Sequence, residues 1–251
     1  MCRHLAYLGD PLPVGELVVS PPHGLYRQSW APRRQAHGTV NADGFGVGWY
    51  APDDPVPARY RRAGPIWADA SLLDLARVVR SGAVLAAVRD ATVAGADAEA
   101  ASAPFATGRW LFSHNGAVAG WPGSLAAPAA GLPPAALLEL QARCDSALVW
   151  ALVHHRLSQG FSAGEALAET VVEVAGAAPG SRLNLLLHDG ESVAATTWGD
   201  TLFHRRLPGT GTVVASEPYD DAGDWAVVPD RTLLVATRDD VTLTPLKEPP
   251  A

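Results

Sequence analysis

The second residue of the chain has the chemistry of a nucleophile. Met1 is followed by Cys2, and a Met that precedes a small residue is normally removed during synthesis. Its removal would leave a thiol and a free α-amino group on Cys2, the pairing of nucleophile and base that covalent catalysis uses. Unperturbed pKa values of about 8.5 for the thiol and about 7.7 to 8.0 for the amine allow proton exchange near neutral pH. Without partners, a Cys here is more often a small buried apolar residue.

Polar residues at the ends of two apolar runs are candidates for those partners. The run Trp110–Ser113 is followed closely by Asn115 and Gly116. The Asn115 amide and the Gly116 N–H can donate to one oxyanion, and a glycine admits a substrate closely. The alternative is an ordinary Asn-Gly turn. If Cys2 attacks an acyl group, Asn115 and Gly116 are the predicted oxyanion donors.

A second apolar run ends at Arg89, with Thr92 close behind it. A guanidinium binds both oxygens of a carboxylate and the Thr hydroxyl adds a donor, so the pair suits a substrate carboxylate. The alternative is a local ion pair with Asp90 or Asp97. Asp145 precedes a predicted helix, where it suits a substrate ammonium group, or serves as a helix N-cap alone.

The bulk composition indicates a globular protein that binds a small molecule. The chain has 251 residues, of which 48% are hydrophobic and 18% charged, enough for a sizeable core. Its 19 basic and 26 acidic residues give a net charge of -7, which argues against a nucleic acid or an anionic membrane as partner. We see no apolar stretch of membrane-span length and no signal peptide, and therefore predict a cytoplasmic location.

The cysteines and histidines predict neither a metal site nor a cofactor. Cys2 and Cys144 are too few for a disulfide framework or a zinc cluster, and a bridge between them would be unusual in a reducing cytosol. The eight histidines show no compact ligand spacing; His154 and His155 are adjacent and would point apart on a helix. A homo-oligomer is compatible with the sequence.

Hydrophobic periods and turn residues predict one α+β domain over residues 1–251. Helices are expected at 14–19, 71–79 (capped by Ser71), 146–157 and 163–175. Strands are expected at 3–8, 44–50, 59–62, 83–88, 110–113, 182–188, 192–198, 202–206, 212–215, 232–236 and 241–246. Residues 28–43 read as a functional loop, and 94–104 and 121–134 as further loops. Glycine at every second position from Gly44 to Gly48 predicts a strand that another backbone or a ligand approaches closely.

Five motifs in this order resemble those of the class II glutamine amidotransferases, which belong to the N-terminal nucleophile hydrolases. They are Cys2, Asn41-Ala42-Asp43-Gly44-Phe45-Gly46, Arg89-Asp90-Ala91-Thr92, Ser113-His114-Asn115-Gly116 and Cys144-Asp145-Ser146. The resemblance covers the first 150 residues. It implies a four-layer αββα sandwich, which agrees with the predicted strands and helices.

The resemblance also implies a role for each candidate residue. Cys2 would attack a γ-glutamyl carbonyl, with its α-amino group as the base and then the acid, and Asn115 with Gly116 would bind the oxyanion. Arg89 and Thr92 would bind the glutamyl α-carboxylate, and Asp145 the α-amino group. Many family members have a His two residues before this Arg and an aromatic residue after it. Here Ala87 and Asp90 occupy those positions, so we expect a less enclosed glutamyl pocket.

A closer resemblance, over nearly the whole chain, is to a family of stand-alone hydrolases of ergothioneine biosynthesis. The segments that carry it are Ala31-Pro32-Arg33-Arg34-Gln35, Ser102-Ala103-Pro104-Phe105, Arg182-Leu183-Asn184, Thr196-Thr197-Trp198-Gly199-Asp200-Thr201 and Ala215-Ser216-Glu217-Pro218-Tyr219-Asp220-Asp221. These hydrolases remove glutamate from γ-glutamyl-hercynylcysteine sulfoxide, so the resemblance implies that small-molecule substrate. Its trimethylammonium group is best held by aromatic faces and acidic residues. We expect a leaving-group pocket formed by Trp30, Arg33, Arg34, Tyr219 and Asp220, of which Trp30, Tyr219 and Asp220 have the chemistry to hold this cation.

Two other functions are compatible with these motifs. A glutaminase that passes ammonia to a partner synthase would use the same residues, and would hydrolyse free glutamine quickly. A binding protein that senses a glutamyl metabolite could keep the same fold. The complete set of partner residues around Cys2 favours an enzyme over a binding protein.

Overall fold

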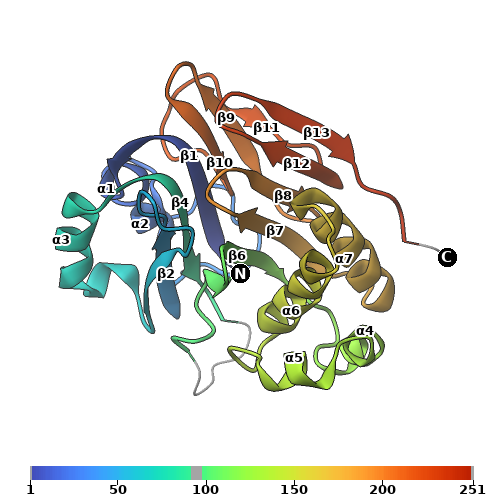
Figure 1. The fold of residues 1–251 in the computed structure, drawn as a ribbon. Coiled ribbons are helices and arrows are strands. Elements are labelled where there is room, and N and C mark those ends of the chain that lie inside the picture. Colours follow the sequence, from blue (N-terminus) through green and yellow to red (C-terminus); the bar gives the residue numbers. More distant parts are fainter. Residues whose placement is uncertain (1, 92–97, 250–251) are drawn as a thin grey trace.

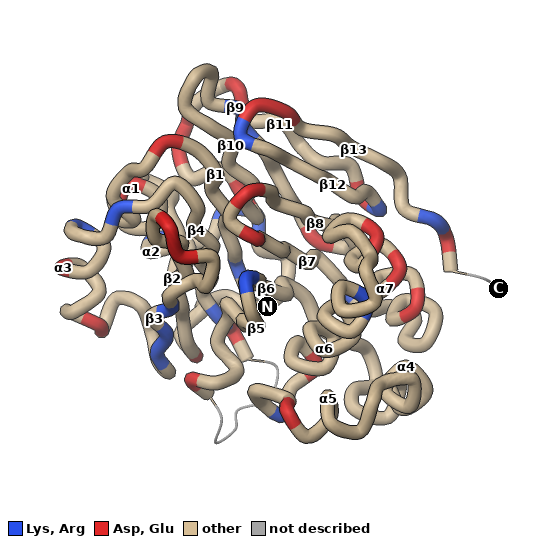
Figure 2. The backbone as a smooth tube through the Cα atoms, in the orientation of Figure 1, with Lys and Arg blue, Asp and Glu red and all other residues tan. Residues whose placement is uncertain are grey.

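The computed structural model describes residues 2–91 and 98–249, in which two antiparallel β-sheets lie face to face between two layers of helices (Figure 1). This confirms the predicted α+β class and the four-layer αββα arrangement. No helix of the described residues is long and apolar enough to span a membrane. Basic and acidic positions are interspersed along both sheets and the helices (Figure 2).

The first sheet has seven strands among the described residues, in the order β11-β9-β10-β1-β4-β2-β3. Their bounds are β1 (Arg3–Pro13), β2 (Gly44–Trp49), β3 (Ala58–Arg62), β4 (Arg80–Arg89), β9 (Phe203–Leu207), β10 (Gly211–Ala215) and β11 (Ala226–Val227). β1 lies between β4 and β10, so a strand from the start of the chain is held by one from near its end.

The second sheet has six strands among the described residues, in the order β13-β12-β8-β7-β6-β5. They are β5 (Phe105–Thr107), β6 (Trp110–Ala117), β7 (Arg182–His188), β8 (Val193–Thr197), β12 (Thr232–Ala236) and β13 (Val241–Pro245). β7 and β8 form the predicted hairpin, in which the Asp189 carboxylate accepts N–H bonds from Glu191 and Ser192 and Gly190 has a φ of 93°.

The helices cover the two outer faces (Figure 1). On the first sheet lie α1 (Gly15–Val18), α2 (Leu25–Gln28), the 3-10 helix η1 (Ile66–Ala68) and α3 (Ala70–Val78). On the second sheet lie α6 (Asp145–Ser158) and α7 (Ala163–Ala177). Three short helices precede α6, namely η2 (Gly123–Leu125), α4 (Ala126–Ala130) and α5 (Pro134–Leu138).

The alternation of side chains along β1 explains why this strand is buried on both faces. Leu5 and Tyr7 belong to the apolar cluster beneath α1 to α3, whereas Ala6 and Leu8 belong to the cluster between the two sheets. A third cluster lies between the second sheet and the helices α6 and α7. The central position of β1 fixes the place of Cys2, which immediately precedes it.

The glycine-rich strand β2 is approached by backbone, as the sequence predicted. A Cβ added to Gly46 would lie 2.3 Å from the carbonyl oxygen of Ala103, well inside the contact distance. The absence of a side chain therefore lets the irregular segment 98–104 lie against the first sheet. This segment forms part of the wall of the cavity described below.

Three local predictions were wrong. His114, Asn115 and Gly116 do not follow a strand but lie inside β6, because β7 continues the pairing through Ala117. The cap of α3 is not Ser71 but Asp69, whose carboxylate accepts the N–H of Leu72. The predicted loop 121–134 contains η2, α4 and the first residue of α5, since its Ala-rich segments form short helices despite their prolines.

Candidate active site

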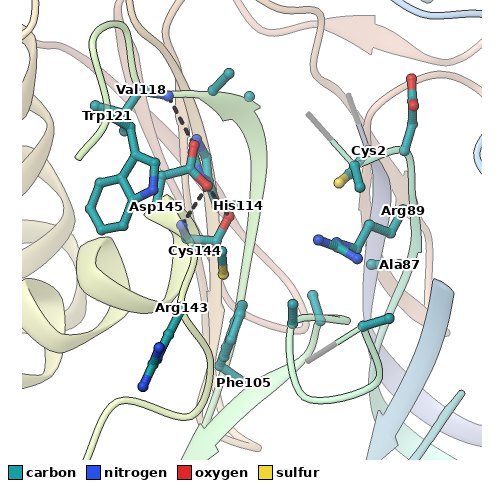
Figure 3. Close-up of a pocket in the computed structure, with 18 of the residues that line it drawn as sticks. Cys2, Ala87, Arg89, Phe105, His114, Val118, Trp121, Arg143, Cys144 and Asp145 are labelled. Atoms are coloured by element: carbon teal, nitrogen blue, oxygen red, sulfur yellow. Dashed lines mark hydrogen bonds between the residues drawn. The ribbon is translucent and has the colours of Figure 1, made fainter. Parts of the chain in front are cut away.

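A cavity of about 660 Å³ opens between the end of β4 and the start of α6 (Figure 3). Cys2 and Arg89 lie on one side of it, and His114 and Asp145 lie on the other. Its described lining comes from Cys2, residues 87–91 at the end of β4, 98–105, 114–121 around the end of β6, and 143–146 at the start of α6. The cavity thus collects residues from distant parts of the chain around the thiol of Cys2.

Cys2 is held at the cavity by Asn115. Its backbone N–H donates to Asn115 Oδ1 at 3.2 Å. Burial raises the pKa of the Cys2 thiol, while a backbone hydrogen bond from Asp90 and the positive charge of Arg89 act in the opposite direction. The thiol therefore stays protonated near neutral pH until a base removes its proton. The nitrogen held by Asn115 becomes an amine when Met1 is removed, and would then be that base.

Asn115 is completely buried and its amide orientation is set by its neighbours. Because Oδ1 accepts from Cys2, Nδ2 is the donor end, and it lies 3.4 Å from Ser216 Oγ. That hydroxyl also accepts the N–H of His4 at 3.0 Å, so Ser216 ties β1 to the Asn115 side chain. The Nδ2–H₂ group has a second hydrogen available for an oxyanion near Cys2.

Gly116 lines the cavity, but the structure gives a different reason for the glycine from the one expected. A Cβ at this position would lie 1.9 Å from the carbonyl oxygen of Arg182 on β7 and 2.6 Å from His114 Nε2. The small residue is therefore required by the close pairing of β6 with β7, whatever the substrate requires.

Arg89 ends β4 and extends its guanidinium into the cavity (Figure 3). Its backbone carbonyl accepts the N–H of Asp43, and its Nη1 lies 3.5 Å from the Asp43 carbonyl oxygen. Among the described residues it forms no ion pair with a carboxylate. The Asp43 carboxylate instead accepts the N–H of Ala91 at 2.8 Å, so Asp43 braces the strand end on both sides of Asp90. Thr92 and Asp97 lie outside the described residues.

Asp145 faces Arg89 and Cys2 across the cavity (Figure 3). Its Oδ2 accepts the N–H of Val118 at 3.0 Å and its Oδ1 accepts the N–H of Ser146 at 2.8 Å. It is the first residue of α6, not its N-cap, which is Cys144. Ser146 Oγ also lies 3.3 Å from Oδ1, whereas Oδ2 has only the Val118 N–H as a donor among the described residues. Oδ2 therefore keeps a lone pair with which the fixed carboxylate can still accept from a substrate ammonium.

His114 is a cavity residue to which the sequence analysis assigned no role. Its ring is buried, with Nε2 2.9 Å from the carbonyl oxygen of Arg182 and Nδ1 3.0 Å from Ser146 Oγ. A carbonyl accepts only, so Nε2 carries the proton and Nδ1 accepts from the Ser146 hydroxyl. His114 thereby connects β6 and β7 to the start of α6, beside Asp145. The sequence signal that could have identified His114 as a residue of the site was its position next to Asn115.

Four other side chains of the lining were assigned no role from the sequence, namely Phe105, Trp121, Arg143 and Cys144, although Phe105 and Cys144 belong to motifs that carry the family resemblances. Trp121 lies beside Asp145, on a turn that is held by the N–H bond from Val118 to this carboxylate. The two cysteines are both free, and burial raises the pKa of Cys144 to about 11. Cys144 is therefore a neutral thiol in the cavity wall.

The aromatic and acidic residues predicted for the leaving-group pocket have other partners. Tyr219 is buried in the apolar cluster beneath α1 to α3 and contacts the Trp225 ring edge-on at 5.1 Å. Asp220 accepts from Trp225 Nε1 at 2.8 Å and pairs with Arg205 at 2.9 Å. Neither Tyr219 nor Asp220 lines the cavity that contains Cys2.

The predicted residues of the loop after α2 are also held by other contacts. Trp30 packs edge-on against Tyr26 and Trp67, with centroid distances of 5.3 and 5.6 Å. The backbone N–H groups of Arg33 and Arg34 donate to the buried carboxylate of Glu217, and the Arg33 guanidinium pairs with Asp221 at 2.9 Å. None of Trp30, Arg33 and Arg34 lines the cavity.

The arrangement suits a substrate with the charges of a free amino acid. A guanidinium and a carboxylate face each other across the cavity and can bind an α-carboxylate and an α-ammonium group. The thiol of Cys2 and the amide of Asn115 are then available to the substrate's side chain. Among the described residues, no group of three or more His, Cys, Asp or Glu side chains is placed to bind a metal ion.

Comparison with known proteins gives consistent results. Residues 25–210 match the family model described as glutamine amidotransferases class-II. The chain is 47% identical to the γ-glutamyl-hercynylcysteine sulfoxide hydrolase of Mycobacterium tuberculosis over 247 residues, which cover 98% of this chain and 97% of that protein. It is 45% identical to the enzyme of the same name from Mycolicibacterium smegmatis, with 98% and 100% covered.

The fold is similar to that of a solved glutamine aminotransferase class-II domain protein from Silicibacter pomeroyi. The TM-score is 0.70 at 24% identity, and the match covers 98% of this chain and all of that one. The layered architecture is therefore shared at low sequence identity.

Proposed function

Because this chain belongs to the class II glutamine amidotransferases, we propose that it hydrolyses the γ-glutamyl amide bond of γ-glutamyl-hercynylcysteine sulfoxide. The products are glutamate and hercynylcysteine sulfoxide. The relatives that carry this name are 45% and 47% identical over nearly their whole length. The observation that carries the proposal is the facing pair Arg89 and Asp145 beside the Cys2–Asn115 hydrogen bond.

The first step is attack by the Cys2 sulfur on the γ-carbonyl carbon. After removal of Met1, the α-amino group of Cys2 accepts the thiol proton, so no separate base is needed. Asn115 Oδ1, 3.2 Å from this nitrogen, accepts one of its hydrogens and orients it. The amine must be neutral to act as a base, which is the reason that a free terminus with a pKa near 8 suits the task.

The attack moves an electron pair onto the carbonyl oxygen. Asn115 Nδ2 and the Gly116 N–H would donate to this oxyanion, which gains more from the bonds than the neutral carbonyl does. When the tetrahedral intermediate collapses, the C–N bond breaks and the Cys2 ammonium gives its proton to the departing amine. Water then attacks the γ-glutamyl thioester, with the same amine as the base, and releases glutamate and the thiol.

The glutamyl half of the substrate would be held by charge. Arg89 binds the α-carboxylate, with the hydroxyl of Thr92 as a further donor, and Asp145 binds the α-ammonium group. Both groups are positioned by backbone contacts, Arg89 through Asp43 and Asp145 through Val118. This fixed spacing would favour a γ-glutamyl unit over a shorter aspartyl unit.

We further propose that the whole chain folds as one domain, because β1 pairs with β10 across nearly the full length of the sequence. A cytoplasmic location suits a thiol nucleophile and two free cysteines. The alternative of a glutaminase that feeds a partner synthase has no equivalent support from the relatives, which are named as hydrolases of a conjugate.

The test is hydrolysis of the purified conjugate, followed by glutamate release, in parallel with free glutamine. We expect rapid release from the conjugate and slow release from glutamine, and mass spectrometry should show a chain that begins at Cys2. Cys2→Ala should abolish turnover and still bind the conjugate. Fast glutamine hydrolysis with a slow conjugate reaction would favour the glutaminase, and an active enzyme that retains Met1 would exclude the amine as base.

A further inference from the structure

The cavity has room for more than a glutamyl group. Its volume of about 660 Å³ is in the range of sites that enclose a whole drug-sized ligand, roughly 300 to 1,000 Å³. Under the proposed function, the leaving group is itself an amino acid, because the scissile nitrogen is the α-nitrogen of a cysteine unit that has its own carboxylate. The hercynyl end adds a second carboxylate beside the trimethylammonium group.

The charges of the lining exceed what the glutamyl group uses. Among the described lining residues, two carry a guanidinium, Arg89 and Arg143. Arg89 is assigned to the glutamyl α-carboxylate and Asp145 to the α-ammonium group. We propose that Arg143 binds a carboxylate of the leaving group and so makes the site selective for γ-glutamyl conjugates of amino acids. This inference rests on the proposed function and adds a specificity-determining residue to it.

The position of Arg143 supports this role. It lies on the same side of the cavity as Asp145, beyond Cys144 and away from Arg89 (Figure 3). The side chain is exposed, and among the described residues no hydrogen bond or ion pair involves its guanidinium. Arg62, by contrast, is an exposed arginine that pairs with Asp69 and Glu99. Arg143 is therefore available to a ligand without breaking an internal contact.

The backbone on both sides of Arg143 is fixed. Gln141 Nε2 donates to the carbonyl oxygen of Ala106 at 2.8 Å, and its Oε1 accepts from Arg59. Ala142 is buried, and Asp145 is held by two N–H bonds on the other side. Only the side chain of Arg143 has to be ordered when a substrate binds, which limits the entropic cost of the contact.

The test uses pairs of substrates that differ by one carboxylate. The full conjugate is compared with an analogue built on cysteamine, which lacks the cysteine carboxylate, and with one built on trimethylhistamine, which lacks the hercynyl carboxylate. Each is hydrolysed by the wild type, by Arg143→Gln and by Arg143→Lys. Arg206→Gln is the matched control, because Arg206 is an exposed arginine on β9 outside the cavity.

We expect Arg143→Gln to raise KM for the full conjugate about 10-fold, because the variant loses a partly exposed charge-assisted hydrogen bond to the substrate. The change in kcat should be smaller. For the analogue that lacks the contacted carboxylate, the same substitution should raise KM less than about 2-fold, which identifies the carboxylate. Arg143→Lys should recover part of the loss. An equal loss on all three substrates would show a structural role and overturn the proposal, as would no loss on the full conjugate.

The proposal can fail separately from the proposed function. If the wild type does not hydrolyse the hercynyl conjugate, the function is wrong, and Arg143 is then tested with γ-glutamylcysteine against γ-glutamylcysteamine. A preference for γ-glutamylcysteine that Arg143→Gln abolishes would still support carboxylate binding. If the variant treats both compounds as the wild type does, the role assigned to Arg143 is wrong.

Discussion

Replacement of Asn115 by Asp separates the two tasks proposed for this side chain. Asp is nearly isosteric with Asn. Its carboxylate can therefore still accept the N–H of Cys2, whose nitrogen lies 3.2 Å from Asn115 Oδ1 in the wild type. Ser216 Oγ, 3.4 Å from Nδ2, can turn its hydroxyl to donate to the new oxygen. The fold should therefore tolerate the change, whereas the donor for the oxyanion is lost.

The expected loss in kcat for Asn115→Asp is large. Removal of one oxyanion donor costs about 10² to 10³-fold in kcat, or roughly 2.7 to 4 kcal/mol. A carboxylate in its place repels the developing negative charge, so we expect a total loss of about 10³-fold or more. The new carboxylate also stabilises the ammonium form of the Cys2 terminus, which raises the pKa of that amine. The acidic limb of the kcat/KM profile should therefore move to higher pH.

The assay is glutamate release from the γ-glutamyl conjugate across pH 6 to 10, with the melting temperature measured in parallel. Ser113→Ala is the control, because Ser113 lies two residues earlier on β6 with its hydroxyl 3.1 Å from His4 Nδ1, outside the cavity lining. It should lower stability by about 1 kcal/mol and leave kcat near that of the wild type. If kcat for Asn115→Asp stays within ten-fold of the wild type, Asn115 does not bind the oxyanion.

Three further substitutions or conditions test the site and its support. Asp145→Asn should raise KM at least about 10-fold, because the negative charge that would bind the substrate ammonium is lost. It should also destabilise the fold by about 1 to 3 kcal/mol, because an amide cannot accept both the Val118 and Ser146 N–H bonds. An unchanged KM would show that Asp145 does not bind the ammonium group. Gly116→Ala places a Cβ 1.9 Å from a carbonyl oxygen of β7 and should cost about 1 to 3 kcal/mol by denaturant titration, whereas a wild-type midpoint would contradict that packing. Burial lowers the pKa of His4 to about 3 from 6.5, so the unfolded chain binds the proton first and stability is lost as the pH falls below about 6.5. That loss is about 2 kcal/mol at pH 5, and a His4→Gln variant should show a shallower dependence.

The candidate site could be predicted because its residue types are specific. A terminal thiol, an Asn-Gly pair after an apolar run and a charged residue of each sign are rare together, and their order along the chain identified the family. The structure brings Cys2, Arg89, Gly116 and Asp145 to one cavity, with Asn115 bonded to the nucleophile. Strands and long helices with a clear period were likewise predicted to within a few residues, as for α7.

Contacts between segments that are distant in sequence decided where strands end and which side chains reach the cavity, which the local pattern could not predict. Asn115 and Gly116 lie inside β6 because β7, some seventy residues later, supplies the pairing that continues the strand. Tyr219 was expected in the leaving-group pocket from its acidic and aromatic neighbours, yet burial beneath α1 to α3 takes it away from the cavity. Burial energy depends on the whole tertiary arrangement, and a short stretch of sequence does not contain it.

The sequence by itself predicted the candidate nucleophile and the candidate binding groups for a glutamyl unit, because these predictions depend on residue types and their order. The family resemblance carried by the same motifs implied the layered architecture, which the structure confirms. The tertiary structure alone decided which side chains complete the cavity. Trp121 and Arg143 come from irregular segments with no period, and they reach the site because the N–H bond from Val118 to Asp145 and the contacts of Gln141 hold those segments in place. The side chains that complete the wall of the cavity are therefore set by long-range packing around a candidate site whose motifs are local.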